Sequence, residues 1–97
     1  MVLTINEIKE RVIPIVKEYG VDSFSLFGSY AKGQADEGSD LDFIMDDGKL
    51  KGLIQYFSLI NKLEEEFHCH VDLISKKGSN KQFLDSIKNE EVVLYER

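Results

Sequence analysis

The sequence predicts an α+β fold in which a small mixed β-sheet is covered by helices on one face. Long segments with helical spacing of apolar residues alternate with short apolar runs that end at turn residues. The length of 97 residues suits a single hydrophobic core. We expect one domain, residues 1–97, because no linker, internal repeat or low-complexity tract interrupts the sequence.

The first predicted element is a helix near the N-terminus. Its apolar residues recur at three- and four-residue steps from Ile5 to Tyr19. Thr4 and Glu7 form a capping-box pair at its start, and Gly20 follows its last turn. Pro14 lies inside this segment, and we expect it to kink or split the helix because proline lacks an amide hydrogen and crowds the preceding turn.

Short apolar runs predict the strands. Val21 to Phe27 and Leu41 to Met45 are separated by residues 28–39, which contain three of the seven glycines and predict a turn and a loop. Val71 to Ser75 predicts a third strand, and Val92 to Tyr95 predicts an extended segment at a sheet edge.

Two further helices are predicted in the second half of the chain. Beyond Leu50 the helical spacing of apolar residues returns, at Leu53, Ile54, Phe57, Ile60, Leu63 and Phe67. We expect Phe57, Leu59 and Ile60 to lie mostly in the core, although Tyr56 and Leu59 widen the apolar face enough to leave room for a protein interface. Ser79 and Gln82 form a second capping-box pair, which opens a short helix.

Composition narrows the classes of partner and the cellular setting. Twelve basic and eighteen acidic residues give a net charge of -6, which disfavours direct binding to nucleic acid or to an anionic membrane. Cys69 is the single cysteine, so no intramolecular disulfide forms and a reducing, cytoplasmic location is favoured. Residues 1–10 lack the pattern of a signal peptide, and no stretch is long enough for a membrane span.

Asp40 and Asp42 are the first candidate functional residues. Alternate side chains on a strand point to opposite faces, so both aspartates share the face opposite Leu41 and Phe43. Two adjacent carboxylates repel each other unless a cation lies between them. Mg²⁺ suits such oxygen ligands and completes its coordination shell with water and substrate phosphate.

Asp72 is a third candidate ligand. If the strand that contains it pairs beside Leu41 to Met45, its carboxylate joins the first two. Three carboxylates can hold two metal ions roughly 3.5 to 4 Å apart, an arrangement that supports in-line displacement at phosphorus.

Gly28 and Ser29 are candidate phosphate-binding residues. A glycine directly after a strand lets a phosphate approach backbone amides closely, and a serine hydroxyl adds a donor. If a short helix starts within residues 30–32, its first amides also favour an anion. Lys32 offers a cation to a triphosphate.

Together these residues resemble a known signature. Residues 28–33, GSYAKG, followed by residues 39–42, SDLD, resemble the motif of the DNA polymerase β-like nucleotidyltransferase superfamily. The short chain resembles its minimal members, the MNT-domain antitoxins that are encoded beside HEPN-domain toxins. The resemblance implies a polymerase β palm-like fold.

The resemblance also implies roles for individual residues. Nucleotide-binding roles are implied for Gly28, Ser29, Lys32 and Ser39. Roles in catalysis and in holding Mg²⁺, as two ions, are implied for Asp40, Asp42 and Asp72. The family position of Lys32 is commonly arginine, so the lysine keeps the charge but loses the two-pronged geometry.

The activity that the resemblance implies is Mg²⁺-dependent transfer of AMP from ATP to a tyrosine hydroxyl of the HEPN-type toxin. This transfer releases pyrophosphate, silences the toxin and makes the chain an antitoxin. Partners are therefore a nucleoside triphosphate and a HEPN-domain toxin, and either a homo-oligomer or a hetero-oligomer is compatible with the sequence.

Alternative functions remain open at this point. The chain could be a non-catalytic antitoxin that covers its partner, although such a binder has no need of all three carboxylates. Transfer to a small molecule lacks support because the chain has no second helical domain to form an acceptor pocket.

Alternative roles also remain open for the histidines. His68 and His70 could form a zinc site with Asp72, or His70 could line the nucleotide site. The run from Glu64 to Glu66 is expected to be a solvated helical face.

Overall fold

The computed structural model describes residues 2–97, so Met1, the first residue of the predicted domain and of its N-terminal segment, lies outside the described residues. The elements follow one another as α1 (Ile5–Tyr19), β1 (Ser23–Phe27), α2 (Gly28–Ala31), β2 (Leu41–Asp46), α3 (Gly52–Phe67), β3 (Val71–Ser75), the 3-10 helix η1 (Lys76–Gly78), α4 (Lys81–Ile87) and β4 (Val92–Glu96). None of the helices within residues 2–97 has the length and hydropathy that crossing a membrane requires.

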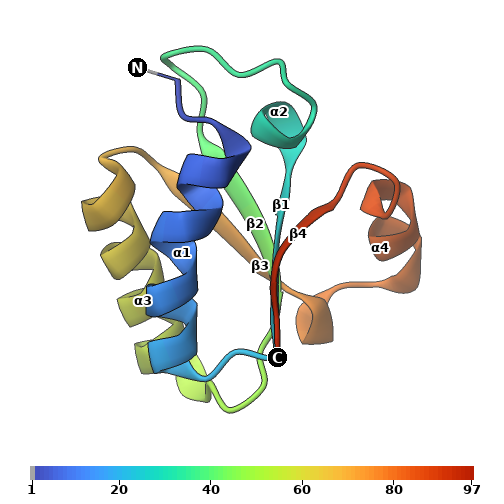
Figure 1. The fold of residues 1–97 in the computed structure, drawn as a ribbon. Helices are drawn as coiled ribbons and strands as arrows, with labels where there is room; N and C mark the ends of the chain where they lie inside the picture. The colour runs from blue at the N-terminus through green and yellow to red at the C-terminus, as the bar shows by residue number, and fades with distance from the viewer. Residues whose placement is uncertain (1) are drawn as a thin grey trace.

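The four strands form one mixed sheet in the order β3-β2-β1-β4. β1 pairs antiparallel with both β2 and β4, whereas β2 pairs parallel with β3 through the crossover helix α3. α1 and α3 cover one side of the sheet (Figure 1). This arrangement confirms the predicted fold class, and the segment from Val92 lies at the sheet edge as expected.

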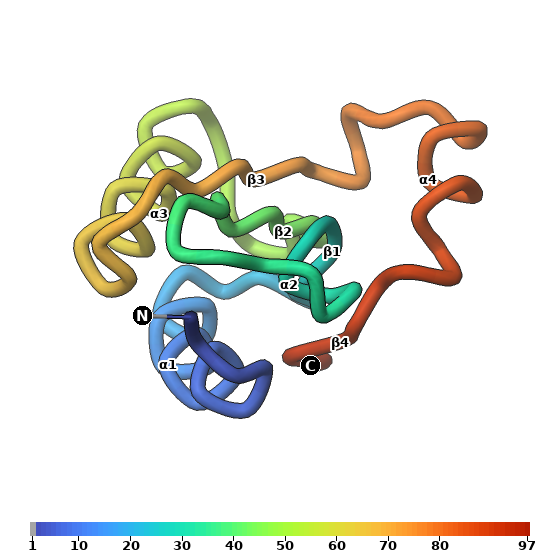
Figure 2. Tube along the Cα trace, turned by 90° about the horizontal axis from the view of Figure 1, so that it is seen from above, coloured from blue at the N-terminus to red at the C-terminus, as the bar shows by residue number. Residues whose placement is uncertain are grey.

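The short helix α4 lies on the opposite side of the sheet from α1 and α3, as the view from above shows (Figure 2). Consistent with this cover, Ile44 is 1% exposed although its strand neighbours Phe43 and Met45 face the main core. Ser25, opposite Ile44 in the ladder, is also buried. The sheet is therefore partly covered on its second face as well.

The main core lies between the sheet and helices α1 and α3. Phe24 and Phe43, on neighbouring strands, are fully buried, and their ring centroids lie 4.8 Å apart. Ile8 and Val12 of α1 and Leu63 of α3 are also 0% exposed in this cluster. Burial of these side chains holds both long helices against the strands.

Helix α1 begins and ends at the predicted residues. Thr4 Oγ1 accepts from the amide of Glu7, and Glu7 Oε1 accepts from the amide of Thr4, each at 3.1 Å. Gly20 caps the C-terminus with a left-handed φ of 74°. The helix continues through Pro14, which is exposed, so the expectation that proline could split this helix is wrong.

The predicted cap of α4 is wrong by one residue. Asn80 is the N-cap, and its Oδ1 accepts from the amide of Phe83 at 2.7 Å. Ser79 instead donates its hydroxyl hydrogen to the carbonyl oxygen of Ser75 at 3.0 Å. Serine and asparagine both favour N-cap positions, and Asn80 is the one that immediately precedes the first helical residue.

The C-terminal half of α3 packs on the core as predicted, whereas its N-terminal half does not. Leu59, Leu63 and Phe67, at four-residue steps, are buried. The N-terminal half of the predicted stripe is exposed: Leu53 by 72%, Ile54 by 88% and Phe57 by 56%. The helix is apolar on more than one side, so periodicity indicated a helix but did not identify the exposed half of the stripe.

We predict that Leu59→Ala destabilises the protein by about 2–5 kcal/mol. The Leu59 side chain is 0% exposed, so its truncation leaves a cavity in the core. Leu53→Ala is the matched control on the same helix and should change stability by less than about 0.5 kcal/mol, since Leu53 is largely solvated. Urea unfolding followed by circular dichroism measures both variants. Equal losses for the two leucines would contradict the assigned core face.

Candidate active site

Two of the three candidate carboxylates face each other across the parallel pair of strands. Asp42 of β2 is in register with Asp72 of β3, and Leu41 is in register with Val71. Leu41 and Val71 are buried beneath the helices, so alternation directs Asp42 and Asp72 to the other face of the sheet. The expectation that Asp72 folds back beside the earlier aspartates therefore agrees with the structure.

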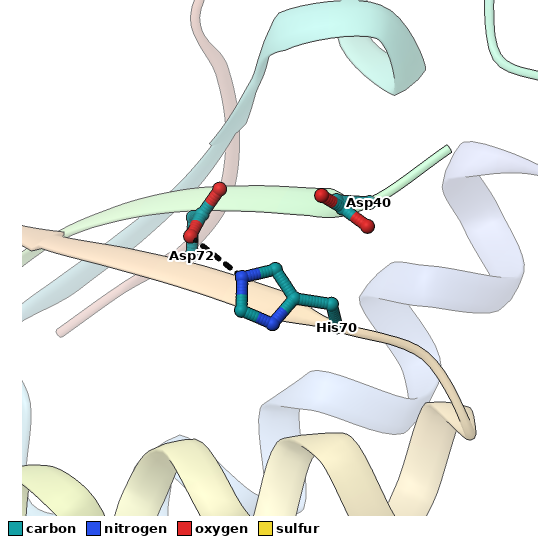
Figure 3. Close-up of side chains that lie close together, drawn as sticks. All are labelled: Asp40, His70 and Asp72. Carbon is teal, nitrogen blue, oxygen red and sulfur yellow. Dashed lines mark hydrogen bonds and ion pairs between the residues drawn. The ribbon is translucent and has the colours of Figure 1, made fainter. Parts of the chain in front are cut away.

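Asp40 joins this group from the residue directly before β2. Its carboxylate, the His70 imidazole and the Asp72 carboxylate point into one space (Figure 3), and their donor atoms lie within 4.8 Å of one another. The backbone holds this arrangement, because Leu41 donates its amide hydrogen to the His70 carbonyl oxygen at 3.1 Å. All three side chains are exposed to solvent.

His70 is held between two carboxylates. Its Nε2 lies 3.0 Å from Asp72 Oδ1, and its Nδ1 lies 3.3 Å from Glu64 Oε2. Glu64 is fixed in turn, because its Oε2 accepts from the amide of Val71 at 3.1 Å.

Glu65 of the predicted solvated face is exposed, whereas Glu64 and Glu66 are partly exposed and each pairs with a charged neighbour. Glu64 contacts His70, and Glu66 Oε2 accepts from Arg11 Nε at 2.7 Å. The C-terminal turn of α3 lies beside the start of β3 and beside α1, which no local pattern in the sequence indicates.

The proximity of these charges changes their ionisation. The pKa of Asp42 is raised from 3.8 to about 6, first by burial, then by a hydrogen bond to Asp72 and the negative charges of Asp72 and Asp40, with His70 acting in the opposite direction. The pKa of His70 is raised by its hydrogen bond to Asp72 and by the charges of Asp72, Asp40 and Glu64, against a smaller opposing effect of desolvation. Both directions show that the site attracts positive charge.

Two features require a glycine at position 28: the backbone conformation there and the close approach of the Asp42 side chain. Its φ is +75°, a left-handed conformation, and a Cβ atom built on it would lie 2.3 Å from Asp42 Oδ2. The turn after β1 therefore presses directly against the Asp42 carboxylate. Any anion bound to the backbone of this turn lies next to the acidic group.

The other predicted nucleotide-binding residues surround this turn. The short helix α2 begins at Gly28, earlier than expected, and contains Ser29. Lys32 Nζ pairs with Glu90 Oε1 at 3.2 Å. Ser39 Oγ accepts from the amide of Asp36 at 2.8 Å, so this hydroxyl holds the loop before Asp40.

His68 does not belong to the cluster of donor atoms, so the structure does not bring together the His68, His70 and Asp72 set considered for zinc. It caps α3 with a left-handed φ of 54°, and its amide donates to the Glu64 carbonyl oxygen at 2.8 Å. In residues 2–97, the three donors that come together include Asp40 in place of His68.

An open groove of about 750 Å³ lies beside the carboxylates. Its lining includes Asp42, His70 and Asp72, together with the apolar side chains Phe27, Tyr56, Phe57, Ile60, Ile74 and Phe83. Phe83 comes from α4. The groove therefore combines a charged end with an apolar wall that suits a planar ring.

The donor set fits divalent metal ions. Carboxylate oxygens are ligands for Mg²⁺ and Mn²⁺, and a cation here would relieve the repulsion that raises the pKa of Asp42. Asp40 and Asp72 provide two such groups and Asp42 lies beside them.

Comparison with known proteins places the chain among nucleotidyltransferases. Residues 10–97 match the family described as "Polymerase beta, Nucleotidyltransferase". The chain is 38% identical over 90 residues to "Putative protein adenylyltransferase MJ0435" of Methanocaldococcus jannaschii, covering 93% of this chain and 97% of that protein. It is 34% identical over 80 residues to "Protein adenylyltransferase MntA" of Thermococcus cleftensis, covering 78% of this chain and 81% of that protein.

The fold also matches a solved structure. A chain in the structure of the tri-AMPylated Shewanella oneidensis HEPN toxin in complex with MNT antitoxin superposes with a TM-score of 0.74 at 17% identity. The match covers 95% of this chain and 72% of that chain. At this identity the match establishes the fold.

We predict that Gly28→Ala disrupts the site more than Gly33→Ala does. Both glycines have a left-handed φ, but a Cβ at Gly33 has no neighbour within 4 Å. Gly33→Ala should therefore cost about 1 kcal/mol of backbone strain, and Gly28→Ala should cost more because it also displaces Asp42. Urea unfolding and Mg²⁺-dependent binding of a fluorescent ATP analogue measure the two effects. Equal behaviour of the variants would refute the contact with Asp42.

We predict that the metal-free protein loses stability as pH rises through about 6, because the folded state binds the Asp42 proton more tightly than the unfolded chain does. The Asp42 contribution is present below pH 3.8 and is lost above the raised pKa. Asp42→Asn should stabilise the protein at pH 7.5 by about 1 kcal/mol, since solvent screening reduces the nominal value of about 3 kcal/mol.

Thermal unfolding in EDTA between pH 4 and pH 8 measures this effect. Asp85→Asn, which removes a carboxylate from α4, is the control and should retain the fall in stability near pH 6. Identical stability profiles for the wild-type protein and Asp42→Asn would rule out the raised pKa of Asp42.

Proposed function

The chain belongs to the polymerase β nucleotidyltransferase family, and from this premise we propose that it transfers AMP from ATP to a tyrosine hydroxyl of a HEPN-type toxin. In this proposal the chain is the antitoxin of a toxin-antitoxin pair. The observation that carries the proposal is the convergence of Asp40, Asp42 and Asp72 beside the turn at Gly28. Such a cluster has a high electrostatic cost and no evident structural purpose.

The three aspartates are proposed to hold two Mg²⁺ ions. When bound, these ions neutralise the phosphates and stabilise the charge that develops on the attacking and leaving oxygens. The negative charges of Asp72 and Asp40, which after burial contribute to the raised pKa of Asp42, support a binding role because they also attract a cation.

Asp72 is proposed to accept the proton of the attacking hydroxyl. In the transfer, the tyrosine oxygen forms a bond to the α-phosphorus of ATP, the bond between that phosphorus and the bridging oxygen of the β-phosphate breaks, and pyrophosphate leaves. The exposed position of Asp72 supports this role, because a hydroxyl on another protein can reach it. The aromatic side chains that line the groove, among them Phe27, Tyr56 and Phe83, offer contacts for an aromatic ring or an adenine.

The turn after β1 is proposed to bind the triphosphate. Gly28 and Ser29 would provide backbone amides and a hydroxyl, and Ser39 would act mainly by holding the loop before Asp40. Lys32 would neutralise phosphate charge after it leaves Glu90. This exchange has a low cost, because an exposed ion pair contributes only about 0–1 kcal/mol.

The proposed acceptor rests on the relatives. The M. jannaschii and T. cleftensis proteins carry the names of protein adenylyltransferases, and the S. oneidensis toxin was found AMPylated in complex with an MNT antitoxin.

We predict that the protein labels its toxin when the two are incubated with Mg²⁺ and ATP labelled at the α-phosphate. The double variant Asp40→Asn with Asp42→Asn should lower the labelling rate at least about 100-fold, because it removes two metal-binding charges. The double variant Asp46→Asn with Asp85→Asn removes two other carboxylates and should keep the wild-type rate. Undiminished labelling by the first variant would refute the catalytic assignment.

The same variants separate an enzyme from a binding antitoxin. Toxin activity is measured after mixing with equimolar antitoxin, with and without ATP. An enzyme neutralises the toxin only with ATP and intact Asp40 and Asp42, whereas a covering partner neutralises it in all cases.

A further inference from the structure

His70 occupies a position in the carboxylate cluster that the three-aspartate arrangement does not require. We propose that His70 is a nitrogen ligand of one divalent metal ion, with Asp40 and Asp72 as its oxygen ligands, and that this site consequently prefers Mn²⁺ to Mg²⁺. This inference concerns the identity of the metal ion and can be tested without any transfer reaction.

The first support is the spacing of the donor atoms. Asp40, His70 and Asp72 each present a donor within 4.8 Å of the other two, and His70 Nε2 is 3.0 Å from Asp72 Oδ1. Metal bonds of about 2.1 Å separate neighbouring ligands by about 3 Å in an octahedral shell. His70 and Asp72 are therefore already at ligand spacing, and Asp40 presents a donor atom within 4.8 Å of both (Figure 3).

The second, independent support is the contact behind the imidazole. Glu64 Oε2 lies 3.3 Å from His70 Nδ1, on the opposite side of the ring from Asp72, and is itself held by the amide of Val71. A carboxylate that lies beside one ring nitrogen favours a proton on that nitrogen and leaves the other nitrogen free for a metal, which is the usual outer contact of a metal-binding histidine. Glu64 thus directs Nε2 of His70 into the cluster.

The chemistry of the donor atoms determines which metal ion the site prefers. Mg²⁺ binds almost entirely through oxygen, whereas imidazole nitrogen suits transition-metal ions. Mn²⁺ accepts the mixed set while keeping the coordination number that phosphate substrates need. One nitrogen among oxygens should therefore increase Mn²⁺ affinity and leave Mg²⁺ affinity nearly unchanged.

The test uses the purified full chain and the metal ions alone. Isothermal titration should give Mn²⁺ binding at least about 10-fold tighter than Mg²⁺ binding, and pulsed electron paramagnetic resonance of bound Mn²⁺ should show coupling to a ¹⁴N nucleus. His70→Gln removes the nitrogen donor and offers an oxygen, so it should abolish the ¹⁴N coupling and weaken Mn²⁺ binding about 10-fold or more. Mg²⁺ affinity should change by less than about twofold.

Two further variants sharpen the result. His68→Asn replaces the nearby histidine outside the cluster with a residue that tolerates the left-handed conformation, and it should keep the ¹⁴N coupling. Glu64→Gln should keep the coupling but weaken Mn²⁺ binding, because it removes the carboxylate that orients the ring.

The inference is overturned if bound Mn²⁺ shows no ¹⁴N coupling, or if His70→Gln weakens Mn²⁺ and Mg²⁺ equally. Labelling of the toxin in Mg²⁺ under either result would leave the proposed function standing. A nitrogen-coupled Mn²⁺ site in a protein that labels no toxin would support the metal assignment and refute the proposed function.

Discussion

Asp42 and Asp72 occupy opposite positions in the parallel ladder between β2 and β3, and the remaining features of the site are arranged around this register. Parallel neighbours need a crossover, which α3 provides, and burial of Leu59 and Leu63 against the sheet holds that crossover in place. A slip of one residue would turn the Asp72 side chain toward the helices. The same packing of α3 on the sheet therefore stabilises the fold and brings the carboxylates together.

This arrangement is expected to reduce the stability of the metal-free protein. Three carboxylates and the closely packed turn at Gly28 are brought together where the charges repel and the pKa of Asp42 is raised. Glu64 increases the negative charge, whereas His70, between Glu64 and Asp72, reduces the repulsion. Local features that oppose stability and persist in a folded protein are expected at functional sites.

Much of the fold followed from local patterns in the sequence. Alternation identified Val71–Ser75 as a strand with Asp72 on the face opposite the core, and the glycine after β1 marked the turn that touches Asp42. These features depend on backbone periodicity and on a left-handed φ, which the sequence expresses directly.

The remaining features depend on contacts between distant residues. Periodicity did not reveal that Leu53 and Ile54 are exposed, because α3 carries apolar residues on several sides. The contact of Glu64 with His70 depends on where the end of α3 lies relative to β3. Residue spacing does not predict this position, because His68 ends the helix in a left-handed conformation. The sequence therefore indicated the aspartates of the site but not the residues that orient them. A metal ligand can be recognised in the sequence by the chemistry of its own side chain. A residue that orients a ligand can be recognised only from its contact with that ligand in the folded chain.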